Sequence, residues 1–163
     1  RVAEKAAPLG LTVLATSRTH RHTPPQLRWV PLAELLATSD FVSLHVPLHD
    51  ETRRMIGTAE LAMMKPTAFL INTSRGSLVD QDALAAALAA NRLAGAALDV
   101  HDPEPPDLSR PPYTDPRVIV TPHAAFYSEE SVAELRRRAA HQVGVRLSGG
   151  RPENVVNPAV FAQ

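Results

Sequence analysis

Residues 68–100, AFLINTSRGSLVDQDALAAALAANRLAGAALDV, decide the fold. The apolar run at 68–72 predicts a buried strand, and the Ala- and Leu-rich stretch at 80–91 predicts a helix with Asp80 as its N-cap. A second apolar run at 94–100 predicts another strand. Strands that alternate with helices in this way are typical of a parallel sheet with helices packed against it.

The same alternation continues on both sides of this stretch. Apolar runs and helical periodicity predict further strands at residues 11–15, 41–46 and 118–121, and further helices at residues 2–8, 31–38, 59–64 and 128–147. The polar stretch at 16–26 and the Pro-rich stretch at 103–116 predict loops, since Pro cannot join the interior of a sheet. We therefore expect an α/β domain with helices on both faces of a parallel sheet.

Composition excludes several classes of protein. The chain has 163 residues, 44% of them hydrophobic, and a formal net charge of zero, which argues against a nucleic-acid partner because binding phosphates needs clustered Lys and Arg. No apolar run approaches the roughly 20 residues that span a membrane, so we expect no membrane partner. The chain contains no Cys, which excludes disulfides and fits a reducing compartment, and we expect a cytoplasmic protein.

The start of the chain is unusual. It begins with Arg1, and residues 1–7 have the pattern of the middle of an amphipathic helix without an N-cap. We therefore expect an N-terminally truncated domain.

Chemically active side chains follow the predicted strands. Arg75 follows the strand at 68–72, Asp99 and Glu104 lie at and beyond the end of the next, and His123 follows the strand at 118–121. In a parallel sheet, ligands bind beyond the carboxyl ends of the strands. An Arg can bind a carboxylate through two hydrogen bonds, a His can transfer a proton near neutral pH, and a carboxylate can orient that His and favour its imidazolium form. Together these are the groups that the reduction of a 2-keto acid needs.

Each of these residues also has a purely structural interpretation. Arg75 fits a solvated turn, Glu104 fits a plain loop acid, and His123 fits a helix cap or a core position. The other histidines have no comparable context: His20, His22, His49, His101 and His141. Of these, His20 and His22 form an H-x-H pair without a third ligand at a recognised spacing, so we predict no metal site.

Several motifs in order resemble the D-isomer-specific 2-hydroxyacid dehydrogenase family, specifically its NAD(P)-binding domain. The match covers nearly the whole chain. The motifs that carry it are HVPL at 45–48, LAMMKP at 61–66, INTSRG at 71–76, GAALDV at 95–100, DPEP at 102–105 and TPH at 121–123.

The resemblance implies a fold and an activity. The fold is a Rossmann-type doubly wound parallel sheet, with residues 1–127 as a partial NAD(P)-binding domain. Residues 128–163 are then a crossover helix and a tail that belong to the substrate domain. The implied activity is hydride transfer between a nicotinamide cofactor and a 2-keto acid or D-2-hydroxy acid, as in a glyoxylate or hydroxypyruvate reductase, by a protein that is a homodimer when full length.

Roles for individual residues follow from the same resemblance. Arg75 binds the substrate carboxylate, His123 is the acid/base, Glu104 is its charge partner, and Asp99 lies near the nicotinamide. The residues expected to contact the dinucleotide are Val46, Pro47, Thr52, Thr73, Ser74, Arg75, Asp99, His123, Ala125 and Phe126.

Two departures from the family pattern matter. The G-x-G-x-x-G turn that binds the pyrophosphate would precede residue 1, so we expect no turnover from this stretch alone. Many NAD-dependent members also carry an acid after the first strand of this chain, where Ser17 and Arg18 stand instead, with Arg21 and His22 close by. These residues suit a 2′-phosphate, so we expect a preference for NADP(H).

Two alternatives remain open. Residues 122–130, PHAAFYSEE, also resemble the C-terminal-binding-protein branch, whose animal members are NAD-sensing corepressors and keep the same Arg, Glu and His. Residues 105–109, PPDLS, resemble the short peptide that such corepressors bind, and a match of this length arises easily by chance. The second alternative is an inactive truncated fragment.

Overall fold

The computed structural model describes residues 2–19, 25 and 27–161, and the chain divides into two compact units. The first unit is Arg1–His123 and the second is Ala124–Gln163. Each unit is described by itself. The predictions made for Arg21, and for His20 and His22, lie outside the described residues.

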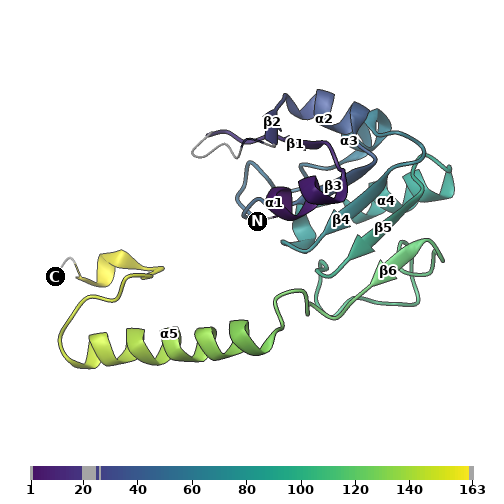
Figure 1. The fold of residues 1–163 in the computed structure, drawn as a ribbon. Coiled ribbons are helices and arrows are strands. Elements are labelled where there is room, and N and C mark those ends of the chain that lie inside the picture. The colour runs from purple at the N-terminus through teal and green to yellow at the C-terminus, as the bar shows by residue number, and fades with distance from the viewer. Residues whose placement is uncertain (1, 20–24, 26, 162–163) are drawn as a thin grey trace. The chain divides into compact units, whose positions relative to one another are not determined.

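Every strand pair in the described part of the first unit is parallel, which confirms the predicted α/β class (Figure 1). The strands form two sheets. One pairs β1 (Val13–Ala15) with β2 (Leu27–Trp29). The other has the order β3-β4-β5-β6 and consists of Phe41–Leu44, Phe69–Asn72, Gly95–Leu98 and Val118–Val120.

Strand β2 was missed by the sequence analysis, and the single expected sheet is divided between β1 and β3. Three residues with a charged Arg28 at the centre give no alternating apolar pattern, so only pairing with β1 reveals β2 as a strand. In the Rossmann order 3-2-1-4-5-6, strand 1 lies between strands 3 and 2 on one side and strands 4, 5 and 6 on the other. The sheet of β1 and β2 corresponds to the first side, and the sheet that begins with β3 corresponds to the second.

The helices of the first unit match most of the predicted spans, with ends that differ by one or two residues. They are α1 (Val2–Ala6) with the 3-10 turn η1 (Ala7–Leu9), α2 (Leu32–Thr38), α3 (Thr58–Met63), the 3-10 turn η2 (Gly76–Leu78), and α4 (Gln81–Ala89). The predicted N-cap is confirmed, since the Asp80 carboxylate accepts a hydrogen bond from the Ala83 N–H at 3.1 Å. Turn η2 was not predicted, because three residues are too few to show a helical period.

The core lies between the four-stranded sheet and helices α2, α3 and α4. Leu36, Leu61 and Leu84 from the three helices have relative exposures of 2% or less, and they pack in one cluster with strand residues such as Leu70. The opposite face of the sheet is exposed at Phe41, Phe69 and Ile119. The described helices therefore hold one face of the sheet in place, and the carboxyl ends of its strands stand at one edge.

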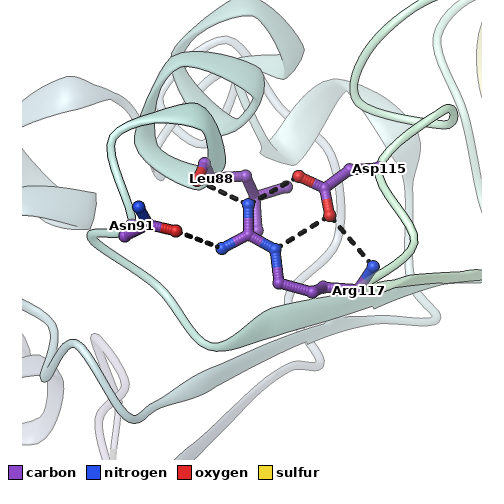
Figure 2. A network of polar contacts seen from close by, with 4 residues as sticks. All are labelled: Leu88, Asn91, Asp115 and Arg117. Atoms are coloured by element: carbon purple, nitrogen blue, oxygen red, sulfur yellow. Dashed lines mark hydrogen bonds and ion pairs between the residues drawn. The ribbon is translucent and has the colours of Figure 1, made fainter.

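Arg117 joins the end of α4 to the start of β6, as Figure 2 shows. Its guanidinium donates to the Leu88 carbonyl at 2.6 Å, to Asn91 Oδ1 at 3.0 Å and to both carboxylate oxygens of Asp115 at 2.9 and 2.6 Å. These hydrogen bonds lower the pKa of Asp115 to about 2. The carboxylate is therefore ionised at neutral pH, and its bonds to Arg117 hold the start of β6 against the end of α4.

The second unit contains the long predicted helix α5 (Glu129–Leu147). Ser128 caps it, because its hydroxyl accepts a hydrogen bond from the Ser131 N–H at 3.1 Å. The helix ends before Gly149, whose φ of 80° lies in the left-handed region. The 3-10 turn η3 (Pro158–Phe161) follows. Among the helices that the structure describes, none is long and apolar enough to cross a membrane.

Gly76 makes the closest backbone approach at the edge of the sheet. A Cβ built at this position would lie 2.0 Å from the carbonyl oxygen of His101 and 2.1 Å from the carbonyl carbon. Both are main-chain atoms, which cannot rotate away as the end of a side chain can. Only Gly therefore lets turn η2 contact the segment after β5. This contact fixes the position of Arg75, the residue directly before the turn.

Gly76→Ala should destabilise the first unit by about 1–3 kcal/mol, because the added methyl group must push one backbone segment away from the other. Thermal denaturation should show a midpoint lowered by about 2–4 °C for each kcal/mol lost. The control is Gly144→Ala in the middle of α5, where a built Cβ meets nothing within 4 Å. That variant should gain about 0.5–1 kcal/mol of helix stability. Equal losses in the two variants would contradict the close approach.

Candidate active site

The carboxyl ends of β3, β4, β5 and β6 meet at one edge of the sheet in that order. Asn72 ends β4, is 1% exposed, and uses both ends of its amide group. Its Nδ2 donates to the Arg75 carbonyl at 2.8 Å, and its Oδ1 accepts from the Ser74 N–H at 3.1 Å. Asn72 therefore folds residues 73–75 into a tight loop that presents Arg75 at the edge.

Hydroxyl groups join the loops after β3 and β4. Ser74 Oγ donates to the Val46 carbonyl at 2.7 Å, and Thr52 Oγ1 donates to the Pro47 carbonyl at 2.8 Å. The structure thus brings four of the residues predicted to contact the dinucleotide into one connected surface, with the exposed Thr73 beside them. Because the hydroxyls of Ser74 and Thr52 make these internal bonds, they shape the loops.

A second set of bonds joins the ends of β5 and β6. Thr121 Oγ1 donates to Asp99 Oδ1 at 2.5 Å, and the Thr121 N–H donates to the Leu98 carbonyl at 3.0 Å. Asp99 is 4% exposed, so its carboxylate is held inside the edge. Thr121 is therefore fixed two residues before His123.

His123 and Glu104 form the predicted pair. His123 Nδ1 lies 3.0 Å from Glu104 Oε2, and the two side chains are 43% and 38% exposed. The hydrogen bond from His123 is the main cause that lowers the pKa of Glu104, and the main-chain N–H of His101 adds to it. Glu104 is thus ionised at neutral pH and can accept the Nδ1 proton. His123 has a φ of 54°, in the left-handed region that residues other than Gly seldom adopt.

Arg75 is exposed at the same edge, but the structure does not bring it into contact with His123 or Glu104. The one hydrogen bond that its guanidinium makes among the described residues runs from Nη1 to the carbonyl of the neighbouring Ser74, at 2.6 Å. Its side chain is therefore held only locally, next to the His–Glu pair in strand order.

Ser17 and Arg18 lie beyond the end of β1, as predicted, and both are exposed. Ser17 Oγ accepts a weak hydrogen bond from the Thr19 N–H at 3.4 Å. Arg18 forms an ion pair with Glu51, with 2.5 Å between Nη1 and Oε2. Ala125 and Phe126, the remaining predicted contacts of the dinucleotide, belong to the second unit.

The sequence analysis missed three residues that shape this edge. Glu51 carries the partner charge of Arg18, Thr121 joins Asp99 to the turn before His123, and His101 contacts both Glu104 and Thr121. The position of Thr121 directly after a predicted strand was a usable signal. Nothing in the sequence indicates the contact of Glu51 with Arg18 or of the His101 ring with Thr121, because each joins segments far apart in the chain.

A family model described as "D-isomer specific 2-hydroxyacid dehydrogenase, NAD binding domain" matches residues 1–125. The chain belongs to this family. Among curated relatives, the glyoxylate reductase of Korarchaeum cryptofilum is 41% identical over 162 residues, which cover 98% of this chain and 49% of the relative. The chain thus spans about half the length of the curated relatives it matches.

Solved structures of the family agree with the Rossmann-type fold. An NAD-complexed D-isomer specific 2-hydroxyacid dehydrogenase from Lactobacillus delbrueckii ssp. bulgaricus is 35% identical, with a TM-score of 0.83 over 96% of this chain and 52% of that chain. The acyclic imino acid reductase Bsp5, in complex with NADPH and D-Arg, is 32% identical, with a TM-score of 0.83 over 95% of this chain and 49% of that chain. The first unit therefore has the fold of the family's NAD-binding domain.

Asn72→Asp should lower the free energy of unfolding by about 1–3 kcal/mol at about pH 7, because an ionised carboxylate cannot donate to the Arg75 carbonyl. Burial raises the pKa of the introduced carboxyl, and the protonated form regains a donor. The folded state then binds the proton more tightly than the unfolded state, so the loss should shrink as the pH falls. Chemical denaturation at about pH 7 and about pH 5 measures the difference.

The matched control for this variant is Asn91→Asp. Asn91 is exposed, and its Oδ1 only accepts a hydrogen bond from Arg117, so a carboxylate keeps the same contact. This control should lose no stability at either pH. A loss of the same size and pH dependence in both variants would refute the role of the Asn72 amide.

Proposed function

We propose that this chain is the nucleotide-binding half of an oxidoreductase that transfers a hydride between a nicotinamide cofactor and a 2-keto acid or D-2-hydroxy acid. A glyoxylate or hydroxypyruvate reductase is the specific form that we favour. The observation that carries the proposal is the pair of His123 and Glu104, 3.0 Å apart at the carboxyl edge of the sheet. The names of the family's relatives support the reaction class.

The residues at the edge suit a bound dinucleotide. Parallel strands that end in short loops form the crevice in which such cofactors bind. Ser74 joins the loop after β4 to the loop after β3, and Thr52 closes the loop after β3 on itself. When bound, the reduced nicotinamide supplies the hydride that adds to the keto carbon. We assign Val46, Pro47 and Thr73 to the binding surface at this edge, with Asp99 near the nicotinamide. Ala125 and Phe126, in the second unit, are also assigned to the cofactor on the strength of the family resemblance.

His123 supplies the proton for the reduction. Nδ1 faces the ionised Glu104, so Nε2 is the nitrogen that exchanges a proton with the substrate. The imidazolium donates this proton to the keto oxygen as the hydride adds to carbon, and the product is the 2-hydroxy acid. Glu104 stabilises the imidazolium before the transfer and keeps the ring oriented. In the oxidation direction the neutral ring takes the proton back.

Arg75 binds the substrate carboxylate. Its guanidinium presents paired N–H donors that match the two carboxylate oxygens, and its exposed position beside the pair allows it to turn from the Ser74 carbonyl to a ligand. The strand order supports this role, because Arg75 follows β4 and the pair of Glu104 and His123 follows β5 and β6 at the same edge.

His123→Ala should lower kcat for the reduction of glyoxylate, hydroxypyruvate or phenylpyruvate by roughly 10²-fold or more, because the reaction loses its positioned acid. Arg75→Ala should instead raise KM strongly, with a smaller loss of kcat. Steady-state kinetics of the whole protein that contains this chain measures both kcat and KM. Binding of NAD(H) without turnover of any of the three acids would favour the corepressor-like alternative.

Glu104→Gln should shift the pH profile of the reduction. The contact with His123 lowers the pKa of Glu104, so the carboxylate that faces the ring is ionised. A neutral amide stabilises an imidazolium less than a carboxylate does, so activity in the reduction direction should fall off at lower pH than in the parent. Initial rates across the pH range measure the shift. An unchanged profile would mean that Glu104 is not the charge partner of His123.

We also propose that the site prefers NADP(H). The proposal rests on Ser17 and Arg18 at the end of β1, a position that meets the adenosine ribose in this fold. The ion pair with Glu51 adds a condition, because a 2′-phosphate must compete with that carboxylate for the Arg18 guanidinium. Arg18→Ala should weaken NADPH binding roughly tenfold to a hundredfold and leave NADH binding unchanged.

Glu51→Gln should do the opposite and tighten NADPH binding. Fluorescence titration of the parent and both variants, each with NADPH and with NADH, measures these affinities. Tighter binding of NADH by the parent, or no loss of NADPH affinity in Arg18→Ala, would refute the preference.

A further inference from the structure

His101 has a buried imidazole ring and lies against the segments that carry Glu104 and His123. It follows β5 and is 7% exposed. Its ring packs edge-on against Tyr113, with ring centroids 5.3 Å apart and an interplanar angle of 71°. An aromatic core residue would account for this packing without a polar atom, so the polar atoms of His101 need their own explanation.

His101 contacts both sides of the pair. Its main-chain N–H donates to Glu104 Oε1 at 2.9 Å, while Glu104 Oε2 faces His123. Its ring Nε2 lies 3.1 Å from the carbonyl oxygen of Thr121. The same carbonyl accepts the His123 N–H at 3.0 Å and closes the turn over Pro122. The ring of His101 and the main chain of His123 therefore meet on one oxygen atom.

These contacts fix the tautomer of His101. A carbonyl oxygen only accepts, so Nε2 must carry the hydrogen. Nδ1 is then a bare acceptor, and within the described residues this buried atom has no hydrogen-bond partner. An acceptor buried without a partner is unfavourable for folding. The ring thus gives up one hydrogen bond and makes the other to the turn that carries His123.

We propose that His101 is a positioning residue, whose ring N–H holds the Thr121 carbonyl and with it the turn that orients His123 toward Glu104. Its effect on turnover rests on the function proposed above, whereas its effect on the orientation of His123 does not. Without the ring N–H, the Thr121 carbonyl keeps only the His123 N–H among its hydrogen bonds with described residues. The turn then gains freedom, while Arg75 and the substrate carboxylate are unaffected.

The first test needs no substitution. ¹⁵N NMR of the imidazole rings in the parent protein identifies which nitrogen of His101 carries the hydrogen. The expected result is the Nε2–H tautomer with a hydrogen slowly exchanging with water. An Nδ1–H tautomer would overturn the proposal, because the hydrogen bond to Thr121 could then not exist.

The second test compares two substitutions. His101→Phe keeps an aromatic ring against Tyr113 and removes the donor, whereas His101→Gln restores an N–H donor at a similar reach. We expect His101→Phe to lower kcat for 2-keto acid reduction about tenfold with KM unchanged, since small displacements of a reacting group slow catalysis by such factors. His101→Gln should recover most of the loss. His141→Phe, on the exposed surface of α5, is the matched control and should leave kcat unchanged.

The position of His123 itself separates this proposal from the proposed function. In His101→Phe the ring ¹⁵N shifts of His123 should move, and in His101→Gln they should return toward those of the parent. If no 2-keto acid is turned over by the parent, the proposed function fails and these shifts still decide the role of His101. Unchanged His123 shifts in His101→Phe would overturn the positioning role, as would equal kcat values for the parent and both variants.

Discussion

The close approach of Gly76 to the main chain of His101 is the constraint on which this edge of the domain depends. A built Cβ at residue 76 would lie 2.0 Å from the His101 carbonyl oxygen, so the two backbone segments are in direct contact with no room for a side chain between them. The segment before the contact presents Arg75, and the segment after it leads to Glu104. One glycine therefore sets the separation between Arg75, which suits a carboxylate ligand, and Glu104, which pairs with His123.

From this contact outward, hydrogen bonds connect the ends of all four strands. Ser74 joins the loop after β4 to that after β3, and Thr121 joins β6 to Asp99 at the end of β5. Glu104 then reaches across to His123. Most of these bonds use main-chain groups or short side chains, which lose little conformational entropy when they are ordered. The bonds along this edge thus order it at a low cost in conformational entropy, while Arg18 and Arg75 extend exposed from it.

Local chemistry made most of the fold predictable, and distance in the chain limited the rest. Asp80 was recognisable as a cap because a cap and its helix are neighbours in sequence. The pair of Glu104 and His123 was reachable because adjacent parallel strands end at the same edge. Strand β2 and the contacts of His101 were not, since a three-residue strand shows no period and the ring of His101 acts on a residue twenty positions away.

The left-handed conformation of His123, with φ at 54°, has a consequence for how this domain can be engineered or can evolve. Glycine and asparagine adopt such a backbone at less cost than histidine does, so selection for thermal stability alone would favour replacing this residue. Selection for turnover would oppose the exchange. Selection for stability and selection for turnover therefore act in opposite directions on this one residue. Libraries screened only for heat resistance would be expected to enrich folded, inactive proteins at this site.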